Sequence, residues 1–290
     1  METTLIFEQG MELPEFASFP LVETADGRAA LRAYFEPYLS IARERGVGIL
    51  LDAPTWRANP DWGAKLGYSL EQLEAANRAA VAFMDGLRGE ADVLVSGCVG
   101  PRGDGYVPGE LMTPAEAEDY HGWQAGIFAD TSVELVSALT MNYVEEAIGI
   151  ARAAGRAGLP GVISFTVETD GRLPSGQPLR EAVEQVDAET GGAPAYFMIY
   201  CTHPTHFAEV LDEDGAWKER IRGLRANASK MSHAELDAAE ALDAGNPDEL
   251  AFDYVALREK LPNLTVVGGC CGTDHRHIDA ISRAWAQTSS

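Results

Sequence analysis

The chain contains no long apolar segment and no recognisable export signal. Its apolar runs all fall short of the ~20 residues that a membrane-spanning helix needs. The first ten residues, METTLIFEQG, lack the basic segment and the extended apolar stretch of a secretory signal peptide. We therefore expect a cytoplasmic protein with no membrane partner.

Basic residues are scarce. The 22 Lys and Arg residues stand against 45 Asp and Glu residues, which gives a formal net charge of -23. Proteins that bind nucleic acids normally present a basic face, and anionic lipid surfaces attract Lys and Arg. The charge balance therefore argues against both partners. The charge balance does not determine the oligomeric state, and it is compatible with a homo-oligomer.

Cysteine is also rare, with four residues in the whole chain: Cys98, Cys201, Cys270 and Cys271. Two of them are adjacent, which is a poor basis for a framework of structural disulfides. Thiols that bind a metal ion in a reducing compartment fit this pattern better.

Apolar segments rich in β-branched and aromatic residues alternate with helical patterns along all 290 residues. Most of these segments are short and continuously apolar, as expected for parallel strands that are covered on both faces. No Gly-x-Gly-x-x-Gly motif follows the first of them, so a dinucleotide-binding sheet has no support. No linker divides the chain, and we expect a single α/β barrel domain over residues 1–290. The expected strands are 47–55, 91–100, 133–140, 161–169, 195–201, 221–229 and 264–270.

Helix starts are marked by capping residues. Ser69 with Gln72 and Thr113 with Glu116 have the spacing of capping boxes, in which each side chain accepts from the other's backbone N–H. Asn142 precedes the helical pattern that ends near Gly155, and Asp274 can cap the last helix.

Three of the four cysteines follow expected strands. Cys201 ends the strand 195–201, Cys270 ends the strand 264–270, and Cys271 follows it directly. In a parallel barrel the carboxyl ends of all strands lie at one rim, where catalytic groups sit. Adjacent strand residues point to opposite faces, so both Cys270 and Cys271 reach one ion only if the backbone bends there, and glycines on both sides of the pair permit that bend.

Three protein ligands leave one position of a tetrahedral zinc site open, as in catalytic sites. Three thiolates give the site a net charge of -1, which makes the metal a weak Lewis acid. Such a metal is poorly suited to producing hydroxide, but it deprotonates a substrate thiol that joins it. The matching reaction is attack by that sulfur on a methyl group of a sulfonium or ammonium donor. The alternatives are buried cysteines that fill the core, or redox chemistry through a vicinal disulfide; Cys98 is interpreted as core packing.

The segment GGCCGTDHRHI (268–278) resembles the zinc motif of the homocysteine S-methyltransferase family. Cys201 in YCTHP matches the upstream zinc cysteine of that family, and APTWRAN (53–59), SGCVGPRGDGYVPGE (96–110) and SFTVETDGRLPSG (164–176) match further segments. The resemblance implies a TIM (β/α)8 barrel, Zn²⁺ bound by Cys201, Cys270 and Cys271, homocysteine as methyl acceptor and methionine as product.

Three positions depart from the family pattern. The family opens with a strand that leads into Asp-Gly-Gly, and METTLIFEQG resembles the residues that come after those glycines. The first barrel strand is therefore expected to be missing from this chain, with the natural start upstream of Met1. Leu139 stands where the family often has a glutamate that binds the substrate amino group, and Tyr200 stands where it usually has asparagine.

Polar and aromatic residues near the expected rim are candidates for the substrate side. Thr55 and Trp56 either face the substrate or pack the rim, and Glu168 and Asp170 either bind a substrate amine or form a turn. His203 is expected to donate a hydrogen bond beside the metal ligands. The function that the sequence favours is zinc-dependent methyl transfer to homocysteine. Methyl transfer to another thiol, or a truncated, non-catalytic zinc-binding relative, stays open because of Leu139 and the missing strand.

Overall fold

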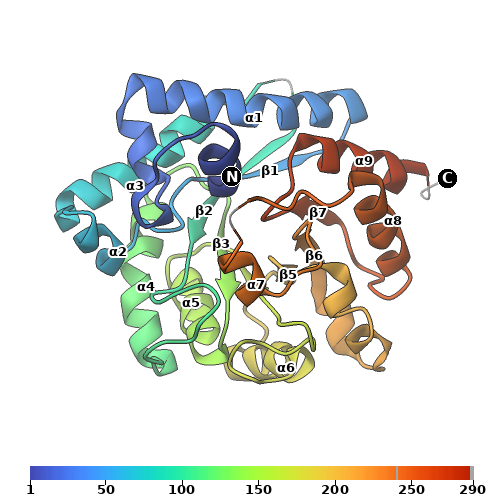
Figure 1. Ribbon diagram of the computed structural model, residues 1–290. Helices are drawn as coiled ribbons and strands as arrows, with labels where there is room; N and C mark the ends of the chain where they lie inside the picture. Colours follow the sequence, from blue (N-terminus) through green and yellow to red (C-terminus); the bar gives the residue numbers. More distant parts are fainter. Residues whose placement is uncertain (90, 240, 288–290) are drawn as a thin grey trace.

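A computed structural model describes residues 1–89, 91–239 and 241–287. Its parallel strands form a single curled sheet with helices around the outside (Figure 1). Each strand overlaps a segment that the sequence predicted. The strands are β1 Ile49–Asp52, β2 Val93–Val99, β3 Leu135–Met141, β4 Gly161–Phe165, β5 Tyr196–Tyr200, β6 Ile221–Ala226 and β7 Val266–Gly269.

The order of the strands in the sheet is their order in the chain, and each neighbouring pair is parallel. This is the topology of a (β/α) barrel, in which a helix returns the chain to the start of the next strand. Several expected strands end too late. β4 stops at Phe165 and β6 at Ala226 because the residues that follow leave strand geometry to form rim loops.

The helices between the strands begin where the capping residues predicted. Ser69 and Thr113 both form complete capping boxes with the backbone and side chain three residues later. Asn142 does not cap the helix α5, because its side-chain amide instead donates to the carbonyl of Asp104 at 2.8 Å. The helices are α1 Ala25–Arg45, α2 Pro60–Lys65, α3 Leu70–Asp85, α4 Pro114–Ala129, α5 Val144–Arg156, α6 Leu179–Thr190, α7 His233–Asp237, α8 Pro247–Arg258 and α9 His275–Gln287.

Within the described ranges, none of these helices combines the length and the apolar character needed to cross a bilayer.

The strands place alternate side chains on the two faces of the curled sheet. Leu51, Val95 and Leu224 point outward and pack under the helices in the main hydrophobic core. Their neighbours in the chain point into the barrel interior, which we call the lumen. A separate apolar cluster there contains Leu50, Cys98, Leu135, Leu139, Val162, Met198, Tyr200 and Val266 together with the three remaining cysteines.

The sheet does not close between β1 and β7, which are its edges in the described part of the chain. Val266 and Val267 of β7 are half-buried, whereas all residues of the central strand β3 are buried. The helices α1 and α9 flank this open side (Figure 1), and Arg45 forms an ion pair with Asp279 at 2.6 Å between them. The seven-stranded sheet agrees with the expectation of a barrel that lacks one strand.

Candidate metal centre

The three cysteines predicted to converge lie together at the carboxyl-terminal rim of the sheet. Cys201 directly follows β5, and Cys270 and Cys271 directly follow β7. The sulfur of Cys201 lies 2.7 Å from that of Cys270 and 3.6 Å from that of Cys271. All three sulfurs fall within 4.8 Å of one another, so one metal ion could contact them all.

Backbone geometry outside the strand region turns the sulfurs toward one point. Cys201 has φ of 56°, in the left-handed region that non-glycine residues seldom adopt. Gly272, next to the adjacent pair, has φ of +76°, and a Cβ there would meet the carbonyl oxygen of Asp243 at 2.4 Å. The bend predicted at the paired cysteines is therefore present, and strain at Cys201 is of the kind that accumulates at functional sites.

Two buried polar side chains hold this geometry in place. Asn227, just after β6, donates its side-chain amide to the carbonyl of Cys201 at 2.9 Å and accepts from the N–H of Cys271 at 3.2 Å. His233, in α7, contacts the same Cys201 carbonyl through Nε2 at 2.8 Å. The amide of Asn227 thus joins the two halves of the cysteine cluster directly.

The loop between β2 and α4 covers the sulfurs. Its Tyr106 places a hydroxyl 2.8 Å from the sulfur of Cys201 and 3.8 Å from that of Cys271. The Tyr106 ring stacks on His233, with centroids 4.3 Å apart. The N–H of Arg102, earlier in this loop, donates to the fully buried carboxylate of Glu146 at 2.8 Å. The loop is therefore fixed at both its start and its centre.

The thiols differ in their protonation. Burial and hydrogen bonds to the other two sulfurs raise the pKa of Cys201 well above its usual range, and burial likewise raises the pKa of Cys270. Hydrogen bonds from Cys201 and Cys270 lower the pKa of Cys271 well below its usual range. Burial also raises the pKa of Tyr106, so its hydroxyl keeps its proton at neutral pH. The hydrogen bonds among the sulfurs thus favour the thiolate form at Cys271 over Cys201 and Cys270.

Of the residues predicted for the substrate side, Trp56 lies in the cluster with the sulfurs. It is half-buried and belongs to the same apolar group as Tyr106 and the cysteines. Thr55 is fully buried, and its hydroxyl donates to the carbonyl of Cys98 at 2.7 Å. Thr55 packs the rim in this structure, and contact of either residue with substrate stays a prediction.

The two acidic candidates lie in different places. Glu168 contacts Nδ1 of His233 at 3.2 Å, so it is linked through that ring to the Cys201 carbonyl. Asp170 accepts from the N–H of Arg172 at 3.1 Å, which is the contact of a turn residue. Any contact of these carboxylates with a substrate amine stays a prediction.

His203 does not lie against the cysteine sulfurs as expected. Its Nδ1 contacts the hydroxyl of Thr205 at 2.9 Å, and its Nε2 lies 3.8 Å from Asp253. His233 has the position beside the cluster that the sequence assigned to His203. Sequence reasoning missed His233, Asn227 and Tyr106; the signal available for Asn227 and Tyr106 was their place in segments that follow strands.

Comparison with known protein families shows to which family this chain belongs. Residues 10–285 match the family model described as homocysteine S-methyltransferase, which is nearly the whole chain. The chain belongs to the homocysteine S-methyltransferase family. Membership places it among methyltransferase enzymes and agrees with the resemblance found at residues 268–278.

Solved structures of this methyltransferase family share the fold. The metallated form of the homocysteine methyltransferase MmuM from Escherichia coli superposes with a TM-score of 0.68 at 17% identity, covering 95% of this chain and 91% of that one. The oxidised form of the same enzyme gives a TM-score of 0.71 at 18% identity, covering 98% and 91%. At these identities the likeness establishes the barrel fold.

One further relative matches about half of this chain. Methionine synthase from Mycobacterium tuberculosis is 32% identical over 144 residues, which is 48% of this chain and 11% of that protein. The match thus spans about a tenth of the length of the relative.

The donor set of the cysteine cluster fits a soft metal ion. Thiolate ligands select zinc, copper(I) or iron–sulfur clusters over the hard cations that prefer oxygen. Cys98, the fourth cysteine, is buried in the lumen and lies outside the group of three. This agrees with its interpretation as core packing.

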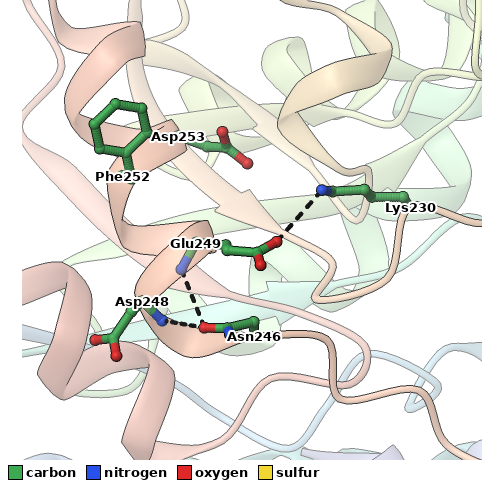
Figure 2. A pocket seen from close by; sticks show the side chains of 6 residues that line it. All are labelled: Lys230, Asn246, Asp248, Glu249, Phe252 and Asp253. Atoms are coloured by element: carbon green, nitrogen blue, oxygen red, sulfur yellow. Dashed lines mark hydrogen bonds and ion pairs between the residues drawn. The ribbon is translucent and has the colours of Figure 1, made fainter.

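A surface pocket of about 380 Å³ lies beside α8, away from the sulfurs. Figure 2 shows Lys230 paired with Glu249 across it, at 3.5 Å, and Asn246 capping α8. Its lining is polar except for the exposed ring of Phe252, and it includes none of the cysteines. This pocket is therefore separate from the cysteine cluster in its lining residues.

Proposed function

We propose that the chain is a zinc-dependent S-methyltransferase that moves a methyl group from a sulfonium or ammonium donor to the thiol of homocysteine, giving methionine. The observation that carries the proposal is the convergence of three thiols, from two strand ends, within 4.8 Å. Family membership supplies the reaction class. The names of the relatives support homocysteine and methionine as acceptor and product.

Cys201, Cys270 and Cys271 would hold the metal. Bound by these three residues, zinc would leave a coordination position for a substrate sulfur and would lower the pKa of that thiol, which would then react as a thiolate at neutral pH. Asn227 and His233 hold the Cys201 backbone in its strained conformation. The three cysteines therefore need little rearrangement to bind the metal.

Tyr106 and Trp56 suit the methyl donor. Both donor classes carry a positive charge next to the methyl group, and aromatic faces attract such cations. Tyr106, in the β2–α4 loop, places its hydroxyl against the sulfurs of Cys201 and Cys271. Exclusion of water strengthens the attraction between a thiolate and a cationic donor, because the local dielectric constant falls.

The transfer itself needs no catalytic base. The substrate sulfur forms a bond to the methyl carbon as the bond from that carbon to the donor sulfur or nitrogen breaks, and the electron pair of the broken bond stays with the donor. The negative sulfur and the positive donor both become neutral. The task of the protein is therefore to supply a thiolate and to align it with the methyl group.

A screen of methyl donors tests this proposal. With homocysteine as acceptor, we expect methionine to form from at least one of S-methylmethionine, adenosylmethionine and betaine. Chelation of zinc should lower the rate at least ~100-fold, by removing the metal that provides the thiolate, and added zinc should restore it. The measurement is methionine production followed by mass spectrometry.

Two results of the screen would contradict the proposal. If the chelated protein is as active as the metal-loaded protein, the zinc role is wrong. If no donor gives methionine while another thiol is methylated, homocysteine is the wrong acceptor. Leu139, a buried apolar residue near the carboxyl end of β3, is the observation that favours this second result.

A further inference from the structure

A pair of opposite charges lies in the lumen below the cysteine cluster. Asp52 ends β1, and Arg225 lies in β6 between two residues that point outward, Leu224 and Ala226. Their side chains form an ion pair through Oδ2 of Asp52 and Nη1 of Arg225. Among the described strand residues, the other side chains that fill the lumen are uncharged. Filling a barrel therefore does not explain this pair, because a partly buried ion pair usually stabilises no better than apolar packing.

The two side chains of the pair do not use all of their hydrogen-bonding groups. The second carboxylate oxygen of Asp52 is buried and has no hydrogen-bond partner. A guanidinium carries five N–H donors arranged for two-point contact with a carboxylate. Within residues 1–89, 91–239 and 241–287, the contact with Asp52 is the one side-chain hydrogen bond of Arg225. Its guanidinium also lies 5.1 Å from the ring of Tyr200. Both charged groups therefore have unused capacity.

The depth of the pair below the sulfurs matches the length of a short thiol substrate. The carbonyl of Arg225 accepts from the N–H of Cys201 at 2.9 Å, and Arg225 is aligned with Gly268, two residues before Cys270. At about 3.3 Å per strand residue, the backbone of Arg225 lies roughly 3–7 Å below the rim that carries the sulfurs. With carbon–carbon bonds of about 1.5 Å, three carbons between a sulfur and a carboxyl group span roughly 5 Å.

We propose that Asp52 and Arg225 bind the charged end of the substrate thiol, with its ammonium group at Asp52 and its carboxylate at Arg225. The inference rests on the proposed function, and it assigns the acceptor to thiols that are α-amino acids. The ion pair opens, and each partner exchanges its contact for one with the substrate. The four charges remain paired, so no charge is left buried and alone.

Binding of thioethers to the zinc-loaded enzyme tests this assignment, measured by isothermal titration calorimetry. Methionine has both charges, 4-(methylthio)butanoate lacks the ammonium group, and 3-(methylthio)propan-1-amine lacks the carboxylate. We expect the wild type to bind methionine at least tenfold more tightly than either analogue. The Arg225→Met variant should bind methionine and 3-(methylthio)propan-1-amine with similar affinity, because the partner of the carboxylate is gone. The Asp52→Asn variant should bind methionine and 4-(methylthio)butanoate with similar affinity, because the partner of the ammonium group is gone.

Matched variants separate recognition from stability. Arg222→Met, an exposed position on the same strand, should keep the wild-type preference. Arg225→Lys keeps the charge and should retain most of the preference for a carboxylate, which keeps the test decisive if Arg225→Met does not fold. Equal binding of the three thioethers by the wild type, or an unchanged preference in Arg225→Met, would overturn the inference.

Propanethiol distinguishes this inference from the proposed function. It has a sulfur but no charged end, so its coordination to zinc reports on the metal site alone. Coordination of propanethiol without any preference among the thioethers would overturn the role of Asp52 and Arg225 and leave the methyl-transfer proposal standing. A clear preference among the thioethers, with no thiol ever reaching the metal, would overturn the methyl-transfer proposal instead.

Discussion

Replacing Cys271 by serine is expected to lower zinc affinity by about 100- to 1,000-fold. Zinc sites in small peptides bind with about 10–16 kcal/mol, so each of four ligands contributes roughly 3–4 kcal/mol. Serine keeps the size of the side chain but does not supply a thiolate. Because Cys271 is the sulfur with the lowered pKa, its loss removes the most readily formed anion of the cluster. Competition with a chromophoric chelator measures the affinity.

Cys98→Ser is the matched control for this prediction. Cys98 is buried in the same lumen cluster but lies outside the group of three sulfurs. The variant should bind one equivalent of zinc with wild-type affinity. If Cys271→Ser also keeps one tightly bound zinc ion, or if Cys98→Ser loses it, the ligands are misassigned.

Asn227→Ala is expected to weaken zinc binding by about 10- to 100-fold, although Asn227 touches no sulfur. The side chain anchors the carbonyl of Cys201 and the N–H of Cys271, so its removal releases both halves of the cluster. Loss of groups that orient metal ligands typically costs about 10- to 100-fold in affinity. Strain at Cys201 should then relax toward ordinary strand geometry.

Asn77→Ala separates this effect from a general loss of stability. Asn77 is also fully buried, but it donates to the carbonyls of Ala58 and Leu73 and accepts from Gln124, and it bonds to none of the three cysteines. We expect both alanine variants to unfold at a lower temperature than the wild type, because each leaves buried backbone groups without a hydrogen-bond partner. Zinc affinity should fall in Asn227→Ala alone. An equal fall in both would show that folding, rather than local anchoring, controls the site.

Much of the fold could be predicted because its signals are local. Strands buried on both faces produce continuous apolar runs, and capping residues such as Ser69 and Thr113 act within one helical turn. Strand ends were less predictable. After β4 the segment 166–169 stays rich in strand-forming residues, but the N–H of Glu168 bonds to the carbonyl of Arg172 in a turn instead of to a neighbouring strand. β6 ends just before Asn227, a residue type that is uncommon in strands and whose side chain holds the two halves of the cysteine cluster.

The cysteine cluster was predictable because barrel topology brings all strand ends to one rim. The groups around it were not, because their roles depend on contacts between segments far apart in the chain. His233 belongs to a short helix after β6, yet it contacts Cys201 and stacks on Tyr106. His203, much nearer to Cys201 in sequence, points toward Thr205 and Asp253 instead. Sequence proximity to a ligand therefore proved a poor guide.

The central claim is that three sulfurs from two strand ends bind one metal ion and leave a place for the sulfur of the substrate. X-ray absorption at the zinc edge, with and without homocysteine, tests it directly. We expect three sulfur ligands and one oxygen ligand in the resting enzyme, and four sulfur ligands after homocysteine is added. A coordination shell that homocysteine leaves unchanged would contradict it.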